Sequence, residues 1–156
     1  MSVIVTDAGF RAEDWTAGFD GREALSDPAR RSLGLDLAAD LLPEALGDLV
    51  GDFDRIALIR VPFASFADGR GFTLARHLRL LGFRGRLRAV GHVIADQYAM
   101  ARRSGFDEVE IGAELAARQP EDQWLARAGW QAHDYRARLG AETPGRLQPG
   151  MQKVGG

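Results

Sequence analysis

The chain has 156 residues, 46% of them hydrophobic, which is enough for one ordinary core and too few for two comfortable domains. Because it has no cysteine, disulfides, thiol nucleophiles and iron–sulfur ligation by this chain are excluded. Its 20 basic and 22 acidic residues are spread along the sequence and give a net charge of −2, so no domain-wide positive field exists to bind nucleic acid.

The chain divides into three stretches by its hydrophobic pattern. Residues 1–32 show no sustained period, and we interpret them as an irregular N-terminal arm in which Val3–Val5 can form a short strand. From Leu33 the pattern becomes regular, and we expect residues 33–140 to form a single α/β domain. Residues 141–156 are poor in apolar side chains and are expected to be a flexible C-terminal tail.

Four strand patterns alternate with helical patterns in the regular stretch. A period of two over residues 33–38 predicts an edge strand, and the apolar run over residues 55–61 predicts a central strand covered on both faces. Residues 86–91 predict a third strand, and the more polar alternation over residues 108–111 predicts a fourth strand at an edge. The helical patterns cover residues 41–50, residues 72–81, residues 93–101 and a last stretch from about Pro120 to Leu139.

This order predicts an α/β fold of parallel βα units with about four strands, joined by right-handed crossovers. Two architectures remain open, a half (βα)8-barrel-like sheet and a small doubly wound sheet, because periodicity does not separate them. A four-stranded sheet has two open edges and one layer of helices, and the surface that they expose can be covered by a second copy of the chain. We therefore expect a homo-oligomer, most simply a homodimer.

Two loops are candidates for a ligand site, since α/β proteins bind ligands at the carboxyl edge of the sheet. In the first loop Asp68 precedes Gly69, Arg70 and Gly71 at the start of a predicted helix, where outward amides favour an anion and Arg70 adds a fork of donors. Alternatively, the glycines only build the turn and Asp68 caps the helix. Leu74 stands where a dinucleotide fingerprint has its third glycine, so the motif supports a nicotinamide or flavin site only weakly.

The second loop runs from Gly91 to Gln97 and contains the two candidate catalytic residues, His92 and Asp96. A histidine at a helix start is held neutral and can act as acid, base or donor, although a lone histidine is more often structural. Arg88 lies in a strand with apolar neighbours, so it needs a carboxylate or a bound anion, and a salt bridge to Asp68 or Asp96 is the commoner outcome. No two of the three histidines have the i, i+4 spacing of a helical metal pair, and we expect no protein-ligated metal.

A resemblance covers the chain from about Leu33 to Ile111. The segments that carry it are Phe66-Ala67-Asp68-Gly69-Arg70-Gly71-Phe72-Thr73-Leu74-Ala75-Arg76, Gly85-Arg86-Leu87-Arg88-Ala89-Val90-Gly91, Asp96-Gln97 and Arg103-Ser104-Gly105-Phe106-Asp107. In motif order and spacing the chain resembles a bacterial family of unknown function that is often labelled probable oxidoreductase involved in sulfite reduction. Two positions depart from its pattern, because the family usually has aspartate in place of His92 and often cysteine in place of Ser104.

The resemblance implies a role near assimilatory sulfite reduction, with Asp68, Arg70, Arg88, Gly91, Asp96 and Gln97 as the matching site residues. We expect an accessory protein that binds a small anion or docks on sulfite reductase. The alternative is an enzyme that acts on a phosphorylated or sulfur-containing metabolite, and a weaker one is a nicotinamide-dependent oxidoreductase. The longest apolar runs fall far short of the roughly 20 residues that span a bilayer, and the N-terminus lacks a signal-peptide pattern, so we expect a cytoplasmic protein.

Overall fold

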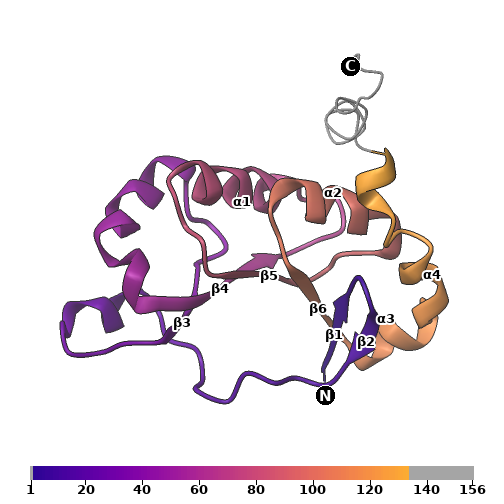
Figure 1. The fold of residues 1–156 in the computed structure, drawn as a ribbon, viewed down its shortest axis with the longest axis horizontal. Helices are drawn as coiled ribbons and strands as arrows, with labels where there is room; N and C mark the ends of the chain where they lie inside the picture. Colours follow the sequence, from indigo (N-terminus) through magenta and orange to yellow (C-terminus); the bar gives the residue numbers. More distant parts are fainter. Residues whose placement is uncertain (1, 134–156) are drawn as a thin grey trace, which may run out of the picture.

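The computed structural model describes residues 2–133, which form a six-stranded sheet covered by helices on one face (Figure 1). The strand order is β2-β1-β6-β5-β4-β3. The strands β3 to β6 run parallel, whereas β1 is antiparallel to both of its neighbours. Their bounds are β1 Ser2–Thr6, β2 Gly9–Arg11, β3 Leu33–Asp36, β4 Ile56–Phe63, β5 Arg86–Gly91 and β6 Glu108–Gly112. The predicted α/β class with four parallel strands is confirmed.

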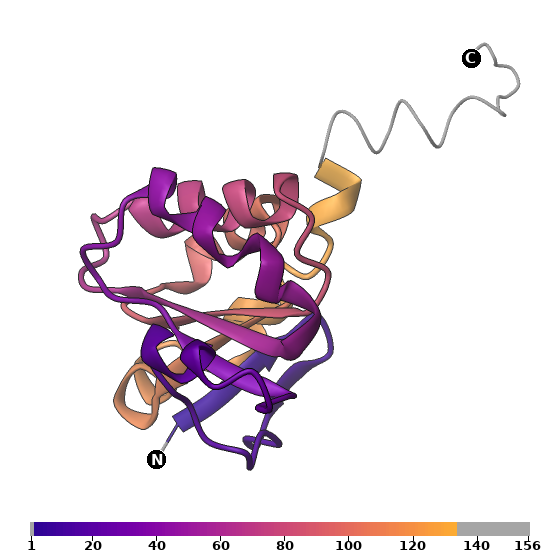
Figure 2. The same cartoon turned by 90° about the vertical axis from the view of Figure 1, so that its left-hand side faces the viewer.

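The parallel strands lie side by side in chain order, so every crossover moves in the same direction across the sheet. Because such crossovers are right-handed as a rule, they place their helices on the same face. Figures 1 and 2 show this helical layer over one side of the sheet. This is the winding of the half-barrel-like alternative, since a doubly wound sheet requires a reversal of strand order. The helical elements are η1 Arg22–Ser26, η2 Pro43–Arg55, α1 Arg70–Leu80, η3 Ala95–Gln97, α2 Tyr98–Ser104, α3 Ala113–Arg118, α4 Glu121–Leu125 and η4 Trp130–His133.

The core lies between this helical layer and the sheet. Alternate residues of each strand point toward the helices, as the period of two requires, and the others point toward the opposite face. Side chains that are 0% exposed fill the core from both layers, and they include Ile59, Val61, Leu87, Ala89 and Val109 from the strands and Ala75, Leu78, Tyr98 and Ala101 from the helices. The opposite face, which we call the helix-free face, carries many charged residues.

The N-terminal region is more ordered than an irregular arm. Val3–Val5 lies in β1 as expected, and the hairpin of β1 and β2 extends the sheet, because β1 pairs with β6. As a result β6 is an interior strand, and the prediction that residues 108–111 form an edge is wrong. The polar residues Glu108 and Glu110 do not indicate solvent there, since they pair with arginines on the helix-free face.

Residues 12–20, which we call the strap, cross the helix-free face and reach the far edge of the sheet (Figure 2). At that edge the amide of Asp20 donates to the carbonyl of Gly34, and the amide of Asp36 donates to that of Asp20, both at 2.8 Å. A Cβ atom on Gly34 would lie 2.6 Å from the carbonyl oxygen of Gly18, so a glycine is needed for this close approach. The strand β3 is the edge strand that its pattern predicts, and the strap covers its outer side.

The predicted C-terminal helix is interrupted within the described residues. The stretch that begins near Pro120 forms α4, ends at Leu125 and resumes only at Trp130 as η4. Gly129 stands in the interruption, and glycine is unfavourable in a helix. The remainder of that predicted helix, residues 134–140, and the predicted tail, residues 141–156, lie outside the described residues. No helix over residues 2–133 is long and apolar enough to cross a membrane.

Candidate functional site

A cavity of about 260 Å³ opens at the carboxyl edge of the sheet, where β5 and β6 end. Three loops build it, since they follow β4, β5 and β6 and the ends of parallel strands meet at one edge. Its lining consists of Phe66, Gly91, His92, Gly112, Glu114, Leu115 and Arg118. Of the residues predicted from the sequence, Gly91 and His92 line the cavity.

The imidazole of His92 is held in one orientation by the end of β4. Its backbone amide donates to the carbonyl of Phe63 at 3.0 Å, and its Nδ1 lies 3.2 Å from the same oxygen. A carbonyl oxygen only accepts hydrogen bonds, so Nδ1 carries the proton and Nε2 is the nitrogen left for a ligand. The ring of Phe66 packs edge-on against it, with centroids 5.0 Å apart. The site therefore contains a positioned imidazole at its wall.

Gln97 links the loop after β5 to the loop after β4. Its side-chain amide donates to the carbonyl of Phe66 at 2.9 Å, and its Oε1 accepts from the amide of Ile94 at 3.0 Å. Position 91 requires glycine, because its φ of 110° is in the left-handed region and a Cβ atom would lie 2.8 Å from the carbonyl oxygen of Phe63. Gly91 lines the cavity, and Gln97 binds the backbone of Phe66, which also lines it.

The loop from Asp68 to Gly71 does not line the cavity. Nε and Nη2 of Arg70 each donate to the Asp68 carboxylate at 3.0 Å, and the backbone amide of Arg70 donates to it at the same distance. Hydrogen bonds from Arg70 hold the pKa of Asp68 below its ordinary value. A Cβ atom on Gly71 would lie 2.3 Å from the ring of Phe63, whereas Gly69 has open space beside it. The donors of this turn are thus satisfied within it, because the Arg70 guanidinium already binds the Asp68 carboxylate.

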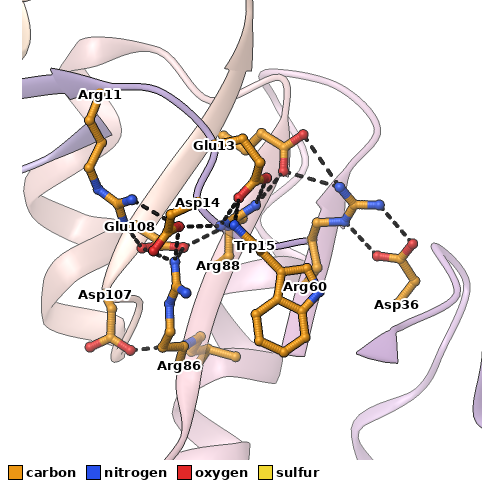
Figure 3. A network of polar contacts seen from close by, with 12 residues as sticks. Arg11, Glu13, Asp14, Trp15, Asp36, Arg60, Arg86, Arg88, Asp107 and Glu108 are labelled. Carbon is orange, nitrogen blue, oxygen red and sulfur yellow. Dashed lines mark hydrogen bonds and ion pairs between the residues drawn. The ribbon is translucent and has the colours of Figure 1, made fainter. Parts of the chain in front are cut away.

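Arg88 points to the helix-free face, away from the carboxyl edge, and Figure 3 shows its partners. The predicted salt bridge is present, but Asp68 and Asp96 are not its partners. The fully buried guanidinium donates to Glu108 at 2.7 Å and to Glu110 and Glu13 at 2.9 Å. Burial alone would lower the pKa of Arg88, but the hydrogen bonds to Glu13 and Glu108 raise it above its ordinary value.

The pairs of Arg88 belong to a larger charge network between the sheet and the strap. The pKa of Glu13 is lowered chiefly by its hydrogen bond from Arg88, and hydrogen bonds from Arg11 and Arg86 lower the pKa of Asp14 to about 2. Each of these charges has a partner within the protein, which favours a structural role. The further pairs are Arg60 with Asp36 and Glu110, Arg86 with Glu108 and Arg11 with Glu108 (Figure 3).

Asp96 lies away from the cavity, exposed and paired with Arg127. Of the two candidate catalytic residues, only His92 lines the cavity. The sequence did not reveal Glu114 and Arg118, which reach the site from α3. No motif marks them, and the one available signal is that α3 directly follows a parallel strand.

Over the described residues 2–133, no group of three or more His, Cys, Asp or Glu side chains is arranged to hold a metal ion. A model of the family described as "Bacterial protein of unknown function (DUF934)" matches residues 35–145. Comparisons with curated proteins and with solved structures found no match.

Proposed function

The chain belongs to this bacterial family of unknown function, and we propose that it is an accessory protein of assimilatory sulfite reduction that binds a small anion in the carboxyl-edge cavity. The resemblance of its motifs supports the metabolic setting, and the guanidinium of Arg118 in the cavity supports the ligand. A role beside sulfite reductase would place the protein in the cytoplasm. The accessory role could also include docking on that enzyme.

The state of Arg118 is the observation that carries the proposal. Arg60, Arg70 and Arg88 each donate to at least one carboxylate, whereas Arg118 forms no ion pair within the described residues. A guanidinium that lacks such a partner is available to an oxyanion, to which it offers a planar fork of donors. His92 lines the same cavity, so an anion that retains a proton has a second polar contact there, at Nε2.

The volume of the cavity limits the ligand. Pockets for drug-sized molecules measure about 300–1,000 Å³. At about 260 Å³, this cavity suits a group such as sulfite or phosphate better than a dinucleotide. In addition, the glycine loop that would hold a pyrophosphate has its first-turn amide donating to Asp68. Both observations favour the small-anion function over a nicotinamide-dependent oxidoreductase.

A second candidate is an enzyme that acts on a phosphorylated or sulfur-containing metabolite, and the orientation of His92 favours it. A general base needs a defined tautomer and a partner that fixes its ring, which the Phe63 carbonyl supplies. In that function Arg118 would bind the anionic group of the metabolite and His92 would move the proton. Asp96, the other acid/base candidate, lies outside the cavity.

Ligand-induced stabilisation tests the proposal. Sulfite, sulfate, phosphate and NADPH are each titrated against the melting temperature of the wild type and of Arg118→Ala. A ligand at 100 times its Kd stabilises by about 2.7 kcal/mol, or roughly 5–10 °C for a domain of this size. We expect sulfite or phosphate to stabilise the wild type and not the variant, with Arg127→Ala as the control because Arg127 lies outside the cavity. If no anion stabilises the wild type, the cavity is not an anion site.

A growth experiment tests the metabolic setting separately. A strain that carries Arg118→Ala in place of the wild type should grow slowly on sulfate and normally on cysteine. Normal growth of this strain on sulfate, with the anion site shown to be lost in the purified protein, would refute the accessory role.

A further inference from the structure

The carboxyl-edge cavity has two acceptors and one charged donor among its polar side chains. Glu114 and Arg118 line it from α3, and His92 lines it from the loop after β5. Glu114, like Arg118, forms no ion pair within the part of the chain that the structure describes, so its carboxylate also faces the cavity without a cation bound to it. All three groups are exposed to solvent, so water satisfies them in the free protein, and a ligand that fills the cavity replaces part of that water.

The tautomer of His92 decides which ligands can do so. Because Nδ1 lies against the Phe63 carbonyl, an acceptor, the neutral form of the ring has its proton on Nδ1 and its lone pair on Nε2. With Glu114, this makes two sites that accept a proton and repel a bare oxyanion oxygen. Among these three side chains, only Arg118 donates hydrogen bonds to such an oxygen.

We propose that this arrangement makes the cavity selective for an oxyanion that keeps a proton, namely hydrogensulfite or hydrogenphosphate, over one that has none, namely sulfate. The inference rests on the proposed anion-binding function and names the protonation state of its ligand. One oxygen of the ligand accepts from Arg118, while the ligand's own proton is donated to His92 or Glu114. Sulfate can satisfy Arg118 but brings only acceptors to the other two groups.

The three anions differ in whether they retain a proton. Near neutral pH, sulfite and phosphate retain a proton on a large part of their population, whereas sulfate has lost both protons. Sites that are built to hydrogen-bond a ligand's proton reject analogues that lack it, because buried acceptors are then left facing acceptors. Since this cavity is open to solvent at exposed residues, we expect a factor of roughly ten, the value of one net hydrogen bond.

The test is a titration of phosphate, sulfite and sulfate by calorimetry near pH 7 and constant ionic strength, on the full chain. We expect the wild type to bind phosphate and sulfite roughly ten times more tightly than sulfate. Glu114→Gln replaces the carboxylate by an amide that can donate, so its sulfate affinity should rise until the preference is largely lost. Glu114→Asp keeps the acceptor and should keep the preference. Glu44→Gln, an exposed glutamate on η2, is the matched control and should behave as the wild type.

Two failures are distinguishable. If the wild type binds sulfate as tightly as phosphate, or if Glu114→Gln leaves the preference unchanged, the selectivity is refuted while the anion site stands. If the wild type binds none of the three anions, the proposed function itself fails. Because Glu114 is exposed, loss of folding is not expected in its variants, and their melting temperatures without ligand verify this.

Discussion

Replacement of Arg88 by lysine should separate the charge network from the cavity. The Arg88 side chain is 0% exposed and makes four hydrogen bonds, to Glu13, Glu108 and Glu110. Lysine keeps the charge but has a single nitrogen, which cannot reproduce a fork that spans three carboxylates. Hydrogen bonds to charged groups contribute about 1.5–3 kcal/mol each, and breaking a buried ion pair costs about 3–5 kcal/mol. Since part of the pairing survives, we expect a loss of about 2–4 kcal/mol.

Urea unfolding followed by tryptophan fluorescence measures this loss. The midpoint should fall with an unchanged m-value, and the melting temperature should fall by roughly 4–16 °C. Arg70→Lys is the matched control, because Arg70 is exposed and pairs only with its neighbour Asp68. It should leave both the free energy of unfolding and anion binding close to those of the wild type. If Arg88→Lys unfolds at the same urea concentration as Arg70→Lys, the network does not stabilise the fold as argued.

Gly71→Ala should destabilise by about 1–3 kcal/mol because its Cβ would collide with Phe63, whereas Gly69→Ala, which has open space, should be neutral or slightly stabilising in urea unfolding. The pKa values of Glu13 and Asp14 are lower in the folded protein than in the unfolded chain, so their contribution to stability is present above about pH 4.5 and is lost as the pH falls toward about 2. In Glu13→Gln, the free energy of unfolding should therefore depend less steeply on pH over that range. A homodimer remains our expectation, and light scattering that reports a monomer at micromolar concentration would contradict it.

The parallel strands could be predicted because their signal is local. The apolar run at β4 and the period of two at β3 depend on neighbouring residues, and they locate the ends of these strands to within two residues. The position of β6 in the sheet could not be predicted in this way. Alternating glutamates are typical of a solvated edge, and only the pairing of β6 with β5 and β1 shows that arginines neutralise them.

The candidate site could be predicted only where it depends on sheet topology. The carboxyl-edge rule selected His92 and Gly91, and both line the cavity. The same rule selected Arg70, but a local contact with Asp68, two residues before it, engages that side chain. Such short-range pairing competes with ligand binding. It depends on side-chain conformation, which cannot be predicted from the hydrophobic pattern of the sequence. Arg118 was missed because nothing in its local sequence distinguishes it from other exposed arginines.

The arginines of the helix-free face and Arg118 at the carboxyl edge differ in what they can bind. On the helix-free face Arg11, Arg60, Arg86 and Arg88 lie among five carboxylates, contributed by Glu13, Asp14, Asp36, Glu108 and Glu110. An anion brought to that face would have to displace a carboxylate that already pairs with an arginine, and Glu108 and Glu110 are also largely buried, which makes the exchange unfavourable. At the carboxyl edge one arginine faces a cavity with no carboxylate bound to it within the described residues. The availability of its donors, rather than the abundance of arginine, is therefore the reason to look for the ligand there.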